Sequence, residues 1–159
     1  MTSAPQRIVC LSAESADWLW RLGAWDQVVG VTALFESPAD AAPKPRVSGF
    51  SSANRSAIVR LQPDLVITFS DVQAALTTEL IQAGLAVLAT NQRTLAEIES
   101  TLALLARAVG RESEGEKLLC EFRCHLAARR LTIGHECSGS RIPRIPSSFH
   151  GSLVCHARR

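Results

Sequence analysis

Short apolar runs alternate with amphipathic segments along the chain up to residue 110. The runs are rich in Val, Ile and Leu, as in strands that are covered on both faces, and they span residues 7–11, 27–32, 65–69 and 85–89. The segments expected to form the intervening helices span residues 16–22, 54–61, 70–84 and 94–109. This alternation predicts an α/β fold, a three-layer Rossmann-like lobe with a mostly parallel sheet and right-handed crossovers.

Polar residues and glycines mark the expected ends of these helices. Ser70-x-x-Gln73 and Thr94-x-x-Glu97 have the form of capping boxes, in which the two side chains satisfy backbone N–H groups of the first helical turn. Asn54 is a suitable N-cap for the helix that follows it. The residues expected to end helices lack a side chain, and they are Gly23, Gly84 and Gly110.

Two parts of the chain depart from the alternation. Residues 33–53 are expected to be mostly loop, because Pro38, Pro43 and Pro45 interrupt any long regular element. A further helix is predicted over residues 112–131, and beyond it the chain is rich in Ser, Arg, Pro, His and Cys without an apolar period. We therefore expect an α/β unit at 6–111, a further helix at 112–131 and an irregular tail at 132–159. The abrupt change in composition favours a truncated or frame-shifted gene as the origin of that tail.

Composition and charge narrow the possible partners. The chain has 159 residues, enough for one domain with a core, and its net charge of +2 does not favour binding to nucleic acid or to an anionic membrane. No apolar run approaches the ~20 residues of a membrane helix, so no membrane insertion is expected. No signal peptide is predicted before the first strand, which places the chain in the cytoplasm as written. A misassigned start would instead give a periplasmic or membrane-anchored protein.

Residues suited to catalysis or metal binding do not form a recognisable set. The chain has neither G-x-G-x-x-G nor a P-loop lysine. All four histidines lie in the last 40 residues, where the sequence pattern is irregular, so no Ser-His-Asp or Cys-His arrangement can be assembled. Cys120, Cys124 and His125 offer soft ligands, but their spacing matches no standard zinc site. We therefore expect no enzyme activity, no metal site and no cofactor.

Aromatic and polar residues follow the expected strands, at the edge where open α/β sheets place their ligands. Aromatic rings offer a large contact area for a flat macrocycle at little entropic cost. We predict that ligand-binding residues come from this edge, namely Phe35, Phe50, Ser51, Phe69, Ser70, Asp71, Asn91 and Gln92. In the alternative interpretation the phenylalanines belong to the core, and the polar residues only cap helices and form turns.

Several short motifs occur together in a characteristic order. They are Arg7-Ile-Val-Cys-Leu11, Gly30-Val-Thr32, Arg46-Val-Ser-Gly-Phe50, Pro63-Asp64-Leu-Val66 and Val109-Gly-Arg111. Over roughly residues 6 to 130, the chain resembles the N-terminal lobe of the periplasmic-binding-protein family that feeds vitamin B12 and iron chelates to ABC importers. The resemblance implies two lobes joined by one long helix, with a corrinoid or ferric chelate bound between them and an ABC permease as the partner. In this chain, residues 6–111 would be the N-terminal ligand-binding lobe, and residues 112–131 would begin the linking helix.

The resemblance also implies roles for particular residues. In the vitamin B12-binding members, aromatics at the positions of Phe50 and Phe69 line the cleft, and a third aromatic falls near Leu34, where its absence here counts against vitamin B12 as the ligand. A glutamate that contacts permease arginines in the family corresponds to Ser56 in this chain. This departure leaves Glu14 and Asp17 as substitute docking residues.

The function expected from the sequence is the solute-binding component of an ABC importer for cobalamin or ferric chelates, present as an incomplete single lobe. Such a lobe buries only one face of a ligand, so weak or no binding is expected from this chain alone. One alternative is a cytoplasmic one-lobe binding or interaction module that uses a second copy as its other jaw. The others are a small Rossmann-like enzyme, which lacks a catalytic constellation, and a non-functional truncated product.

Overall fold

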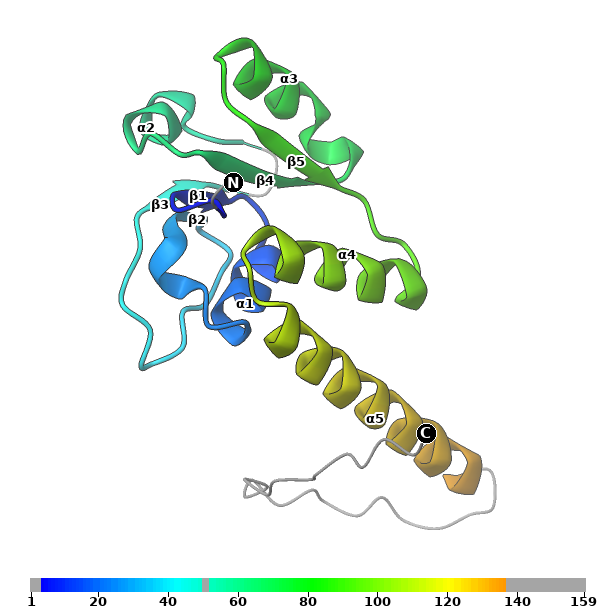
Figure 1. Cartoon of the computed structure of the whole chain (residues 1–159). Helices are drawn as coiled ribbons and strands as arrows, with labels where there is room; N and C mark the ends of the chain where they lie inside the picture. The colour runs from blue at the N-terminus through cyan, green and yellow to red at the C-terminus, as the bar shows by residue number, and fades with distance from the viewer. Residues whose placement is uncertain (1–3, 50–51, 137–159) are drawn as a thin grey trace. The chain divides into compact units, whose positions relative to one another are not determined.

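The computed structural model describes residues 4–49 and 52–136, and the chain divides after Glu116 into two compact units. The first unit contains a sheet of five parallel strands in the order β3-β2-β1-β4-β5 (Figure 1). The strands are β1 (Ile8–Cys10), β2 (Val28–Thr32), β3 (Arg46–Ser48), β4 (Leu65–Phe69) and β5 (Val87–Thr90). The predicted α/β fold with a mostly parallel sheet is confirmed.

Helices cover both faces of this sheet. They are α1 (Ala13–Arg21), α2 (Arg55–Arg60), α3 (Ala74–Gln82) and α4 (Leu95–Ala108), together with the short 3₁₀ turns η1 (Trp25–Gln27) and η2 (Asp71–Gln73). Helices α2 and α3 lie on one face, and α1 and α4 lie on the other (Figure 1). Because successive side chains of a strand point to opposite faces, Val9 and Val66 pack toward Ile58 of α2 and Leu80 of α3.

The ends of the helices follow the sequence signals at most positions. The Thr94 hydroxyl accepts from Glu97 N–H at 3.3 Å, while the Glu97 carboxylate accepts from Thr94 N–H at 2.9 Å, so this capping box is confirmed. The backbone N–H groups of Arg93 and Thr94 hold the pKa of Glu97 below its ordinary value. Gly23 and Gly110 follow helices with φ of +68°, a conformation that costs other residues more.

Among the described residues of 33–53, the expectation of mostly loop is confirmed, but it missed the strand β3. This strand is only three residues long, and it begins directly after Pro45, whose carbonyl accepts from Val31 N–H at 2.9 Å. Proline lacks an N–H group but keeps its carbonyl, so it is compatible with the first position of an edge strand. The short length of β3 and the neighbouring prolines hid it from the sequence pattern.

Helix α5 (Glu112–Glu136) contains the boundary between the two units. It continues past Leu131, so residues 132–136 are helical and the predicted irregular tail begins too early. Residues 137–159, which make up the rest of that predicted tail, lie outside the described residues. In the first turn of α5, Gly115 lies against Ala106 of α4 so closely that an added methyl group would collide with the Ala106 side chain. Among the helices that the structure describes, each is too short or too polar to cross a membrane.

Candidate functional site

The sheet has a topological switch point between β1 and β4. From β1 the chain passes through α1, on one face, to β2, and from β4 it passes through α3, on the other face, to β5 (Figure 1). Because the two connections diverge to opposite faces, a crevice opens between the C-terminal ends of these strands. Open α/β sheets bind their ligands in such crevices.

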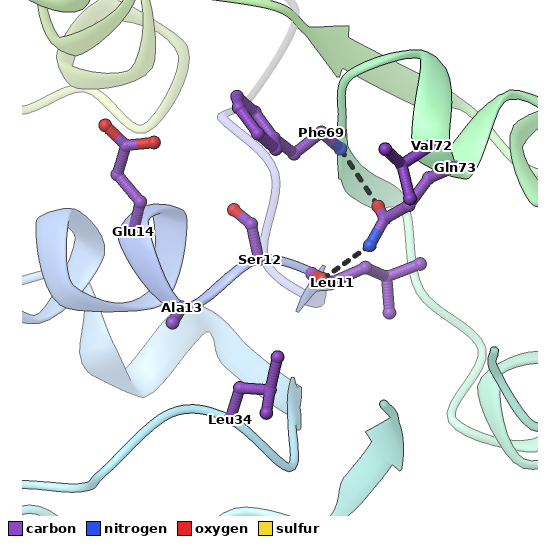
Figure 2. Close-up of a pocket in the computed structure, with 8 residues that line it drawn as sticks. All are labelled: Leu11, Ser12, Ala13, Glu14, Leu34, Phe69, Val72 and Gln73. Atoms are coloured by element: carbon purple, nitrogen blue, oxygen red, sulfur yellow. Dashed lines mark hydrogen bonds between the residues drawn. The ribbon is translucent and has the colours of Figure 1, made fainter. Parts of the chain in front are cut away.

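A pocket of about 180 Å³ lies at this switch point (Figure 2). Its lining residues come from the ends of β1 and β4, the start of α1, the turn η2 and the loop after β2, and they are Leu11, Ser12, Ala13, Glu14, Leu34, Phe69, Val72 and Gln73. Typical small-molecule pockets have volumes of roughly 300–1,000 Å³, so this pocket accommodates only part of a large ligand. Leu34 and Val72 are both exposed and extend the apolar surface beyond the pocket.

Gln73 joins the two strands that form the pocket. Its buried side chain donates from Nε2 to the Leu11 carbonyl at 3.0 Å and accepts at Oε1 from Phe69 N–H at 3.0 Å (Figure 2). The predicted capping box between Ser70 and Gln73 is therefore wrong, because the Gln73 amide is used between strands. The Ser70 hydroxyl instead accepts from Val72 N–H at 3.3 Å.

The backbone turns sharply where β4 ends. Ser70 has φ of 57° and ψ of 176°, a conformation that residues other than glycine adopt at a cost of roughly 1–3 kcal/mol. Its N–H donates to the Thr90 carbonyl at 2.7 Å, which ties the turn to the end of β5. This turn carries the chain from Phe69 directly to Val72 and Gln73, so that all three residues line the same pocket.

Glu14 supplies the carboxylate of the pocket. It lies in the first turn of α1 and accepts at Oε2 from Gln92 Nε2 at 2.6 Å, a contact between residues 78 positions apart in the sequence. Partial burial raises the pKa of Glu14, and the hydrogen bond from Gln92 lowers it to a smaller extent. The Gln92 Oε1 atom is buried and accepts no hydrogen bond from a described residue.

Asp71 and Asn91 both contact the side chain of Arg93. Arg93 Nη2 lies 2.8 Å from Asp71 Oδ1, and Arg93 Nε donates to Asn91 Oδ1 at 2.9 Å. The pKa of Asp71 is lowered, first by a hydrogen bond from its own backbone N–H and then by Arg93. These exposed residues follow β4 and β5 at the carboxyl edge of the sheet but do not line the pocket. Their role in ligand binding, like that of Ser70, stays a prediction.

The predicted aromatic residues have different positions. Phe69 lines the pocket, whereas Phe35 is 4% exposed and packs against Trp25 with ring centroids 5.5 Å apart. A ring buried in this way offers little surface to a ligand, and the neighbouring Leu34 lines the pocket instead. Phe50 and Ser51 lie outside the described residues.

The predicted docking residues are separated along the first unit. Glu14 lines the pocket, Asp17 forms an ion pair with Arg21 at 2.7 Å, and Ser56 is exposed in the first turn of α2. Their contact with a permease stays a prediction.

Gln73 and Val72 line the pocket but are not among the residues that the sequence predicts for the site. The Ser70-x-x-Gln73 pattern predicts a helix cap, and no motif marks the bond that Gln73 makes with the distant Leu11. The family resemblance marks the region of Leu34 only as the place of a missing aromatic.

The fold and sequence are similar to those of known binding proteins. A family model described as periplasmic binding protein matches residues 8–130. A cobalamin-binding protein of Halobacterium salinarum is 33% identical over 132 residues, which cover 80% of this chain and 36% of that protein. A periplasmic vitamin B12 binding protein of Vibrio cholerae shares the fold with a TM-score of 0.72 and 24% identity, covering 82% of this chain and 52% of that chain.

A periplasmic heme binding protein from Pseudomonas aeruginosa shares the fold as well, with a TM-score of 0.74 and 22% identity. The match covers 84% of this chain and 50% of that chain. In each of these comparisons the chain spans about half, or less, of the length of the protein that it matches.

Proposed function

The chain belongs to the periplasmic binding protein family, and from this premise we propose that it is a ligand-binding lobe of the solute-binding component of an ABC importer. The proposed ligands are corrinoids or iron-containing macrocycles and chelates, and the proposed partner is the permease of that importer. The family match supports binding without catalysis, and it favours a periplasmic location over the cytoplasmic one expected from the sequence.

The observation that carries this proposal is the apolar pocket at the β1/β4 switch point. Phe69 and Leu11 form part of its wall, while Leu34 and Val72 expose apolar surface beside it. Exposed apolar side chains that gather around a pocket mark a surface that a ligand or partner covers. A macrocycle placed on this surface contacts the protein through one face only, so the proposed lobe alone binds weakly and a second lobe buries the other face.

A matched pair of leucine substitutions tests this proposal. We expect Leu34→Ala to weaken binding of cyanocobalamin or gallium(III) protoporphyrin by roughly three- to tenfold, because the removed side chain no longer contributes apolar contact area. Leu104→Ala on α4 should leave affinity unchanged, since Leu104 is similarly exposed, at 46% against 54% for Leu34, but does not line the pocket. NMR titration of the labelled chain measures affinities in this weak range.

The two variants must both keep the dispersed spectrum of the wild-type chain for the comparison to count. Equal affinities for Leu34→Ala, Leu104→Ala and the wild-type chain would place the ligand elsewhere on the molecule. Absence of binding by the wild-type chain to every corrinoid, porphyrin and ferric chelate tried at millimolar concentration would contradict the proposed function itself.

A further inference from the structure

The pocket combines an apolar wall with a single ionisable group. Among the eight described residues that line it, Glu14 alone carries a titratable side chain, and none carries a positive charge. Gln92 holds one carboxylate oxygen of Glu14 at 2.6 Å, and the other oxygen accepts no hydrogen bond from a described residue. Glu14 therefore has an oriented acceptor available to a ligand (Figure 2).

Two arginines whose side chains contact loops at this edge of the sheet are already engaged. Arg93 pairs with Asp71 and also donates to Asn91, and Arg46 Nη1 donates to the Ala33 carbonyl at 2.5 Å. An anionic group on a ligand in this pocket would thus meet the Glu14 carboxylate without a cation among the lining residues. Because the site is partly shielded from water, such repulsion between like charges is stronger than in bulk solvent.

The two ligand chemistries named among the similar proteins differ in this respect. A heme carries propionate carboxylates at its edge, whereas a corrinoid carries mostly neutral carboxamides, whose N–H groups donate hydrogen bonds. We propose that Glu14 makes this pocket selective for macrocycles with a neutral, amide-bearing edge over macrocycles with a carboxylate-bearing edge. This inference rests on the proposed function and identifies the corrinoid class as the better ligand.

A pair of porphyrins that differ only in charge isolates the effect of Glu14. Gallium(III) protoporphyrin carries two carboxylates, and its dimethyl ester has the same flat body without them. We define the ester preference as the affinity for the dimethyl ester divided by the affinity for the diacid, measured by NMR titration of the full chain in one buffer and co-solvent. We expect Glu14→Gln to lower the ester preference roughly tenfold relative to the wild-type chain, because glutamine keeps the size of the side chain and removes its charge.

Glu79→Gln is the matched control, since Glu79 is exposed on α3 and does not line the pocket. It should keep the wild-type ester preference, and it corrects for any effect of net charge on the whole chain. The same Glu14→Gln variant should also weaken binding of cyanocobalamin, because a carboxylate accepts a stronger hydrogen bond from an amide than a neutral carbonyl does.

The outcomes separate this inference from the proposed function. If cyanocobalamin binds but Glu14→Gln and Glu79→Gln change the ester preference equally, the selectivity role of Glu14 is overturned and the lobe remains a binding protein. If the wild-type chain binds cyanocobalamin but neither porphyrin, the inference requires that the Glu14→Gln variant bind the diacid. If that variant does not bind the diacid, the inference is overturned. If neither the corrinoid nor the porphyrins bind to any variant, the proposed function fails and the inference fails with it.

Discussion

Replacing Gln73 with leucine should lower the free energy of unfolding by about 2–4 kcal/mol, since it leaves two buried backbone groups without partners. The side chain of Gln73 satisfies the Leu11 carbonyl and the Phe69 N–H at the ends of adjacent strands. Leucine fills a similar volume but can neither donate nor accept a hydrogen bond. The loss therefore comes from unsatisfied polar groups and not from a cavity.

Gln82→Leu makes the same chemical change at an exposed position of α3 and should alter stability by less than about 0.5 kcal/mol. Urea denaturation, monitored by circular dichroism, measures the stability of both variants. Equal slopes of unfolding free energy against urea concentration would show that both variants expose the same surface on unfolding. Equal midpoints for Gln73→Leu and Gln82→Leu would show that the connection between β1 and β4 does not depend on this amide.

Truncation of Ile67 to alanine is expected to cost about 2–5 kcal/mol, because it removes buried methylene and methyl groups and leaves a cavity. Ile67 is fully buried in β4, where it pairs with Cys10 of the central strand β1 and with Leu88 of the edge strand β5. Few residues are placed to collapse into the space, since strands on both sides fix the backbone.

Ile81→Ala is the control for this substitution, because Ile81 on α3 is 56% exposed. It should change the free energy of unfolding by less than about 0.5 kcal/mol. A loss for Ile67→Ala as small as that for Ile81→Ala in urea denaturation would contradict the close packing of Ile67 in β4.

The regular elements could be predicted from the sequence where local chemistry and periodicity agree. Residues Leu65–Phe69 form a strand with the predicted bounds, because a turn signal precedes an uninterrupted apolar run. The capping box of α4 was also predictable, since it involves only residues within one turn. The strand β3 was not, because three residues give no readable period and the pairing of β3 with β2 depends on a partner distant in sequence.

The candidate site was harder to predict because its key contacts join distant segments. Nothing local to Gln73 indicates a bond to Leu11, and nothing local to Glu14 indicates a bond to Gln92. Among the aromatics, Phe69 lines the pocket because it is the last residue of β4, a strand that the sequence predicts. Phe35 and Leu34 are adjacent, and the turn after β2 decides which of them reaches the core and which reaches the pocket.

The site also departs from the local rules that the rest of the lobe follows. Ser70 has a backbone conformation that favours glycine, and partial burial of Glu14 disfavours its charged form. Leu34 and Val72 expose apolar surface to solvent. Unfavourable features of this kind gather at functional sites, where a ligand or a partner compensates for them.

The central claim is that the C-terminal edge of β1 and β4 binds a macrocyclic ligand. Its most direct test is the set of amide shifts in the NMR spectrum of the full chain as cyanocobalamin is added. We predict saturable shifts at Ser12, Leu34, Phe69 and Val72, with weak affinity. Shifts confined to the opposite edge of the sheet, around Asp64 and Ala86, or no shifts at all in a well-dispersed spectrum, would contradict it.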